Sequence, residues 1–123
     1  MKRMFTPIKN TPPGLVALDA TGKITDADYK DTFEPQLDAA VAAHSKARVL
    51  IRFGPEFDGY SAHAALDDAM LGMKHWSHFE RLAVVTDVDW IEHGVRLFAP
   101  LIPAKVRIFP VGSLDEALAW AAA

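Results

Sequence analysis

The 123-residue sequence predicts an α/β fold built around a mostly parallel sheet. Short apolar runs that are typical of buried strands alternate with segments whose apolar residues recur at helical spacing. The connections between them are short, as in strand–helix–strand crossovers. The runs at 49–51 and 82–85 are apolar at consecutive positions, which favours strands covered on both faces.

The first predicted strand covers residues 15–20, and a bulge or turn is expected at 21–23. Thr25 followed by Asp28 then predicts a helix N-cap, because a short polar side chain accepts a hydrogen bond from the first helical turn. Pro35 falls inside the helical pattern and is expected to kink or split that helix.

The next strand is predicted over residues 47–53. We expect Gly54 and Pro55 to end it and residues 56–61 to form a loop. A second helix over 62–73 follows, with apolar residues at helical spacing, and residues 74–79 close it before the next strand.

Residues 82–86 form a buried strand that a short turn joins to a helix over 90–99. Asp87 and Asp89 are expected to cap that helix and to favour its dipole. Alternation over 105–109 predicts a further strand, and Ser113 with Glu116 predicts a capping box at the start of a last helix.

The helix over 90–99 is more apolar than its place on a sheet requires. At about 100° per residue, Glu92, His93 and Arg96 share one narrow arc. The remaining arc is roughly 200° wide and carries no charge, whereas packing on a sheet takes a little over 100°. We therefore expect a second subunit, a ligand, another helix or a membrane surface to cover the surplus.

Composition limits the class of protein. The length suits one domain over residues 1–123, and half of the residues are hydrophobic. The net charge of -3 and the scattered basic residues argue against nucleic-acid binding. There is no cysteine, no signal-peptide pattern and no apolar run long enough for a transmembrane segment. A cytoplasmic location is expected, and peripheral membrane contact stays open.

A distinctive pattern extends from the second predicted helix into the third. It reads Gly72-x-Lys74-His75-Trp76-x-x-Phe79-Glu80-Arg81-x-Ala83-Val84-Val85-Thr86-Asp87-x-x-Trp90-Ile91. This pattern resembles the SpoIIAA-like family of small bacterial proteins, within the STAS group (sulfate transporters and anti-sigma factor antagonists). The similarity runs from residues 14–16 to 106–109 and Glu116, so that it covers nearly the whole chain.

The resemblance implies a SpoIIAA-like/STAS fold, with a mixed four- to five-stranded sheet and helices mainly on one side. The family is also similar in fold to the CRAL-TRIO lipid carriers, which implies an apolar ligand between sheet and helices. STAS antagonists of anti-sigma factors carry a phosphorylatable residue in an Asp-Ser-Ser-Gly-like turn. Ser61 stands near that place without the motif, so it is a candidate for phosphorylation and also for a helix N-cap.

The candidate ligand-binding residues are mostly apolar. The apolar helix and the segment after it supply one wall, the second predicted helix supplies the other, and Asp87 lies at a strand's carboxyl end. The full set is Met70, Met73, Trp76, Phe79, Asp87, Trp90, Leu97, Phe98 and Leu101. Core packing is the alternative for each apolar member.

No catalytic or metal site is predicted. His75 and His78 lack a clear third ligand for zinc, and Ser61 and His63 point in different directions on a helix. No enzyme activity and no cofactor are therefore expected. The sequence favours a binding module for a small hydrophobic or lipid-like ligand. The alternative is a protein–protein regulatory module that buries the same surface in a homodimer or against a partner.

Overall fold

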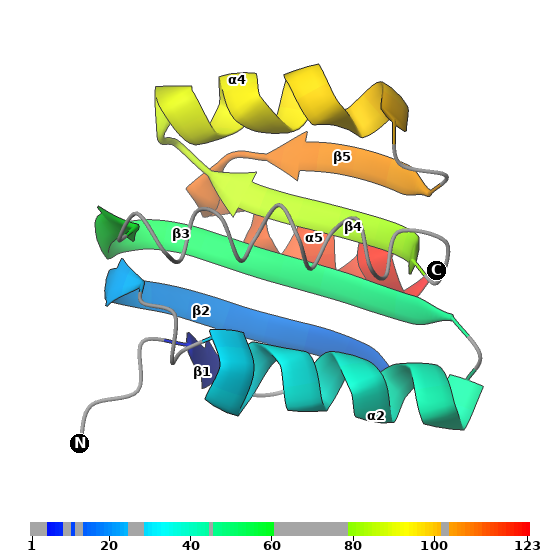
Figure 1. Cartoon of the computed structure of the whole chain (residues 1–123). Coiled ribbons are helices and arrows are strands. Elements are labelled where there is room, and N and C mark those ends of the chain that lie inside the picture. The colour runs from blue at the N-terminus through cyan, green and yellow to red at the C-terminus, as the bar shows by residue number, and fades with distance from the viewer. Residues whose placement is uncertain are drawn as a thin grey trace.

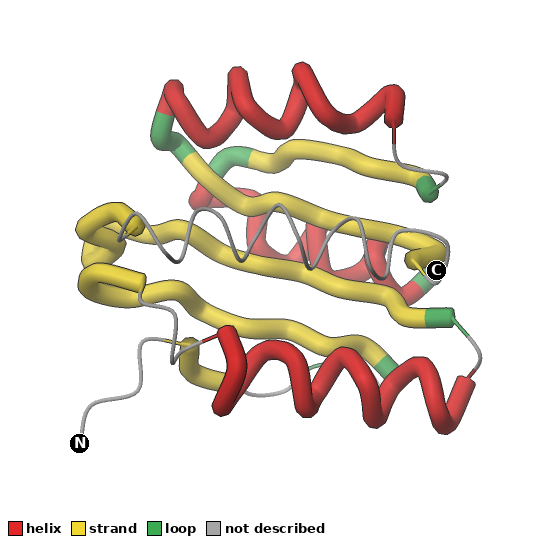
Figure 2. Tube along the Cα trace, viewed as in Figure 1, coloured by secondary structure: helices red, strands yellow, loops and turns green. Residues whose placement is uncertain are grey.

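A single mixed sheet organises the protein. The computed structural model describes residues 5–8, 11, 14–24, 29–44, 46–60, 79–101 and 104–123. Five strands lie in sequential order, β1 (Phe5–Pro7), β2 (Leu15–Ile24), β3 (Ala47–Tyr60), β4 (Phe79–Thr86) and β5 (Lys105–Phe109). Strand β1 is antiparallel to β2, and the other neighbouring pairs are parallel. The arrows of β2 to β5 point the same way in Figure 1, and Figure 2 traces the strands in yellow. The predicted mixed sheet is confirmed.

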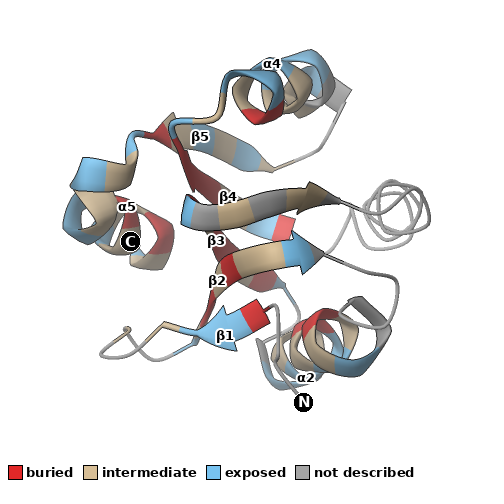
Figure 3. Ribbon diagram, turned by 90° about the vertical axis from the view of Figure 1, so that its left-hand side faces the viewer, coloured by how far each residue is buried: buried red, intermediate tan, exposed pale blue. Residues whose placement is uncertain are grey.

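Helices cover both faces of this sheet. A π-helical turn (Tyr29–Phe33) leads into α2 (Glu34–His44), and α4 (Asp89–Phe98) follows β4. Helices α2 and α4 lie on one face, and α5 (Leu114–Ala122) lies on the other (Figure 3). Right-handed crossovers between parallel strands in sequential order place their helices on the same face. Helix α5 follows the last strand and makes no such crossover.

The alternation of side chains along β3 divides the core into two clusters. Val49, Ile51 and Phe53 pack on the face that α2 and α4 cover, whereas Leu50 packs under α5. Ala83 and Val85 of β4 also face α5 and are fully buried. Both faces of the central strands are therefore buried, as their consecutive apolar residues predicted.

Strand β3 is longer than expected, and the prediction that Gly54 and Pro55 end it is wrong. The strand continues to Tyr60, so that residues 56–60 are not a loop. Pairing of β3 with β4 stops at Phe53, and beyond that point β3 pairs only with β2. Pro55 is tolerated there because its missing N–H removes no bond from a central ladder.

The first helix changes its geometry where proline stands. The π-helical turn ends at Phe33, and the regular α-helix begins at Glu34, next to Pro35. The predicted split is confirmed. The bulge that was expected at residues 21–23 is also present, as register shifts between β2 and β3 on either side of Gly22. The predicted cap at Thr25 and Asp28 lies outside the described residues.

The predicted caps are only partly confirmed. Ser113 is the N-cap residue of α5, as predicted, but its side chain makes no capping hydrogen bond. A 3-10 turn (Val111–Ser113) leads into the helix, and the Ser113 N–H bonds to the Pro110 carbonyl at 2.9 Å. Val88, not an aspartate, is the N-cap of α4, and it forms no side-chain cap. Asp87 instead accepts a hydrogen bond from the Val111 N–H at 3.1 Å. It therefore ties the end of β4 to the approach of α5.

Arginines on the α5 face hold the carboxyl end of that helix. Arg81 donates to the Trp120 carbonyl at 2.8 Å, and its guanidinium carbon lies 5.0 Å from the centre of the Trp120 ring. Arg48 donates to the Ala122 carbonyl. Cations there satisfy helix carbonyls and complement the helix dipole. Arg48 also bonds to Glu80 at 2.9 Å, and this hydrogen bond holds the pKa of the Glu80 carboxyl below its ordinary value.

Candidate functional site

Helix α4 starts where a side chain of β4 sets the turn. The hydroxyl of Thr86 accepts a hydrogen bond from the Val88 N–H at 3.0 Å, and the Glu92 N–H donates to the Val88 carbonyl at 3.1 Å. Glu92 and Arg96 form an ion pair of 2.8 Å one turn apart on the charged side of the helix. The charged arc that the sequence predicted is therefore present.

The apolar side of α4 is only partly buried. Ile91 is 6% exposed and belongs to the core cluster, and Val88 and Val95 pack against that cluster. Trp90 is 56% exposed and Leu97 is 70% exposed. The structure thus confirms that this helix has more apolar surface than its sheet covers.

Trp90 and Leu97 lie on the same flank of the helix, which we call the α4 stripe. Seven residues of helix turn through nearly two full turns, so both side chains leave the helix within about 20° of each other. Their mean direction is about 130° away from that of Ile91 and Val95. The stripe therefore lies on a flank of α4 and not against the core.

One end of the stripe meets an aromatic row on β3. The rings of Trp90 and Phe57 lie 6.1 Å apart between centroids at 38°, and those of Phe57 and Phe53 lie 4.9 Å apart at 72°. Phe53 is buried and Phe57 is half-buried. The row thus leads from the exposed stripe into the core, and the tilted geometries are those that aromatic pairs prefer.

The other predicted site residues divide into three groups. Phe79 is buried at the amino end of β4, about 20 Å along the strand from the end that leads to Trp90, so it does not join the stripe. Asp87 is exposed and bonds to Val111. Met70, Met73, Trp76 and the candidate phosphorylation site Ser61 lie outside the described residues, as do the side chains of Phe98 and Leu101.

Phe57 is a member of this surface that sequence reasoning did not identify. The prediction placed it in a loop after Pro55, where no contact with α4 is expected. The alternation of Phe53, Ile51 and Val49 continues to Phe57 and is the signal that extends the strand. Among the described residues, no group of three or more histidine or acidic side chains is placed to hold a metal ion.

None of the helices that the structure describes has both the length and the apolar character needed to cross a membrane.

Comparisons with known proteins agree with the fold. The SpoIIAA-like family model matches residues 15–122. A crystal structure of an uncharacterized DUF3478 protein with a SpoIIAA-like fold, from Shewanella loihica PV-4, superposes with a TM-score of 0.73. It is 30% identical to this chain, and the match covers 95% of this chain and 90% of that one. No curated protein matches the sequence.

Proposed function

The chain belongs to the SpoIIAA-like family, and we propose that it is a non-catalytic binding module that holds a small apolar or lipid-like ligand against α4. The observation that carries this proposal is the α4 stripe, with Trp90 56% and Leu97 70% exposed on one flank of the helix. Large apolar side chains gathered on a surface usually mark an interaction site.

The shape of the stripe favours an elongated ligand. Trp90 and Leu97 stand seven residues apart, which is roughly 10 Å along the helix axis. An extended acyl chain spans that length, whereas a compact molecule meets only one of the two side chains. Each methylene that is removed from water contributes about 0.8 kcal/mol, so a chain lying along both residues gains several kcal/mol. The aromatic row through Phe57 gives the ligand a rigid end wall.

Native mass spectrometry and thermal unfolding test this proposal. The protein as purified should retain a hydrophobic passenger, and after delipidation a saturated or monounsaturated fatty acid should raise its melting temperature. The variant Trp90→Ser with Leu97→Ser should lose both effects. The matched control is Arg96→Gln, which alters an exposed residue about 110° around the helix from the stripe and should behave as the unaltered protein.

A clean apo mass together with no thermal shift from fatty acids would remove the proposal. Equal ligand stabilisation of the double variant and the unaltered protein would remove the assignment to α4, because the ligand would then lie elsewhere.

A second candidate is a protein–protein regulatory module that buries the same stripe in a homodimer or against a partner protein. The spacing of Trp90 and Leu97 over two helical turns also suits helix–helix contact. In that case Leu97→Asp should convert a dimer to a monomer in light scattering, with no lipid present. An oligomeric state that does not respond to Leu97→Asp contradicts the dimer.

A further inference from the structure

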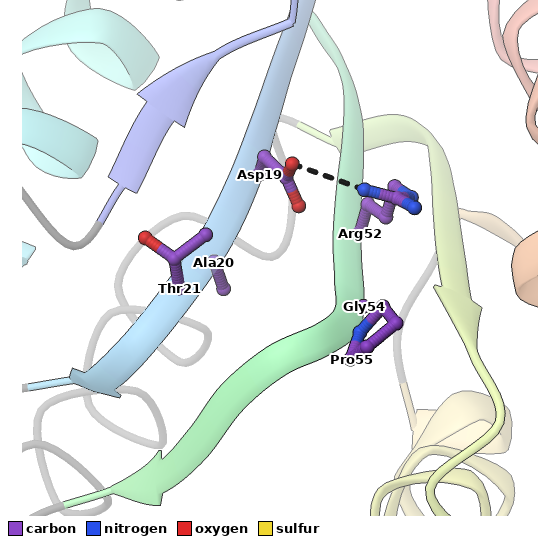
Figure 4. A pocket seen from close by; sticks show the side chains of 6 residues that line it. All are labelled: Asp19, Ala20, Thr21, Arg52, Gly54 and Pro55. Atoms are coloured by element: carbon purple, nitrogen blue, oxygen red, sulfur yellow. Dashed lines mark hydrogen bonds and ion pairs between the residues drawn. The ribbon is translucent and has the colours of Figure 1, made fainter.

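A polar cavity lies on the face of the sheet opposite to the α4 stripe. It has a volume of about 350 Å³ and is lined by Asp19, Ala20, Thr21, Arg52, Gly54 and Pro55 (Figure 4). Asp19 and Arg52 are register partners on β2 and β3, and by strand alternation both side chains lie on the α5 face with Ala17 and Leu50. The cavity lies midway along β2 and β3, next to Phe53, the residue at which the pairing of β3 with β4 ends.

A break in the strand register forms this cavity. Ala20 pairs with Phe53, and the next matched pair is Gly22 with Phe57. Between these two pairs β3 advances by four residues, whereas β2 advances by two. The chain of β3 bends at Gly54 and Pro55 (Figure 4). Irregular pairing of this kind is frequent next to binding sites. Pro55 contributes no N–H that the broken ladder would leave unpaired.

The cavity wall presents two opposite charges. Arg52 Nη1 donates to Asp19 Oδ2 at 3.1 Å, and the two side chains are 27% and 28% exposed. Gly54 makes room for the guanidinium, because a Cβ atom there would lie 3.2 Å from both Cζ and Nη1 of Arg52. The Nε of Arg52 is buried without a hydrogen-bond partner among the described residues. The ion pair with Asp19 therefore leaves one buried N–H group of Arg52 without an acceptor, and a bound ligand would supply one.

The lining decides the class of ligand. A simple anion is attracted by the guanidinium of Arg52 but repelled by the carboxylate of Asp19. A simple cation is attracted by the carboxylate and repelled by the guanidinium. A molecule that carries both charges satisfies both side chains. We infer that this cavity binds a small zwitterion of the amino-acid class, with its carboxylate on Arg52 and its ammonium on Asp19. The volume is sufficient for such a ligand.

Amide and side-chain NMR of the full chain tests this inference. Glycine, L-serine and L-glutamate are titrated separately, and acetate and methylammonium serve as probes that carry one charge each. At least one amino acid should shift the Arg52 Nε–H and Gly54 N–H signals in a saturable way. Acetate and methylammonium should bind at least about tenfold more weakly, because each forms only one of the two charge-assisted hydrogen bonds.

Two variants and one control locate the binding. Asp19→Asn should weaken amino-acid binding about tenfold, and Gly54→Ala should weaken it by crowding the guanidinium. If either variant fails to fold, Arg52→Lys supplies the test, because it keeps the charge but removes the guanidinium that would hold the ligand carboxylate. Arg107→Gln, on the exposed part of β5, should leave binding unchanged. Three results would overturn the inference: no saturable shift with any of the three amino acids, acetate binding as tightly as they do, or unchanged binding in the cavity variants.

Discussion

At the residue scale, single side chains set the boundaries of the elements. Thr86 and Asp87 are adjacent, yet Thr86 bonds to the start of α4, whereas Asp87 reaches the turn before α5. The two residues therefore connect the end of β4 to helices on opposite faces of the sheet. An aspartate that precedes a helix does not cap it when a more distant N–H lies within reach.

Removing the bond from Asp87 should destabilise the protein modestly. Asp87→Ala deletes the acceptor for the Val111 N–H, and we expect a loss of about 0.5–1.5 kcal/mol in the free energy of unfolding. Asp87→Asn keeps a side-chain oxygen and should lose less than Asp87→Ala. Urea unfolding of the three proteins checks this order, and equal losses in both variants would show that charge matters and the hydrogen bond does not.

The Arg48–Glu80 pair makes stability depend on pH in a defined direction. The hydrogen bond from Arg48 lowers the pKa of Glu80 from its ordinary value of 4.5. The stabilisation is therefore complete above pH 4.5 and is lost as the pH falls through the lowered pKa. The effect is small, because the pair is exposed to solvent.

The variant Glu80→Gln tests this contribution. Its stability relative to the unaltered protein should be lower at neutral pH, and the difference should shrink when both are unfolded in urea well below pH 4.5. A difference that stays constant across this range would mean that Glu80 contributes through packing and not through its charge.

At the element scale, α4 combines two kinds of apolar residue on one helix. Ile91 is buried in the core, whereas Leu97 is mostly exposed. If the α4 stripe served internal packing, the free energy of unfolding would depend on both Ile91 and Leu97. If the stripe binds a ligand, the free energy of unfolding of the ligand-free protein depends on Ile91 and not on Leu97.

Alanine substitutions separate these roles. Ile91→Ala should cost about 2–5 kcal/mol in the free energy of unfolding, because it leaves a cavity in the core. Leu97→Ala in the ligand-free protein should change stability by no more than about 0.5 kcal/mol. Thermal and urea unfolding give both values. A loss of several kcal/mol for Leu97→Ala would assign the stripe to internal packing.

At the scale of the whole molecule, much of the topology follows from the sequence. The apolar runs at Val49–Ile51 and Leu82–Val85 identify the central strands of a parallel sheet, because both faces of such strands are covered. Strand β1 and the last residues of β3 could not be predicted in the same way. Phe5 lies in a three-residue edge strand, and Pro55 is an ordinary strand breaker that only the neighbouring register permits.

The candidate surface was partly predictable. The apolar arc of α4 is visible in the sequence because helical periodicity is local, and the exposure of Trp90 and Leu97 agrees with it. The contact of Phe57 with Trp90 was not predictable, since it joins strands and helices that are distant in the chain. The same holds for Asp19 and Arg52, whose pairing depends on the register of β2 with β3.

The most direct test is the solvent exposure of the Leu97 methyl groups, measured by NMR in the presence of a soluble paramagnetic agent. In the delipidated protein the agent should broaden these signals strongly, and oleate should protect them while leaving the methyl groups of Ile91 sharp throughout. Leu97 signals that are equally broadened with and without saturating oleate would contradict the proposal that α4 holds an apolar ligand.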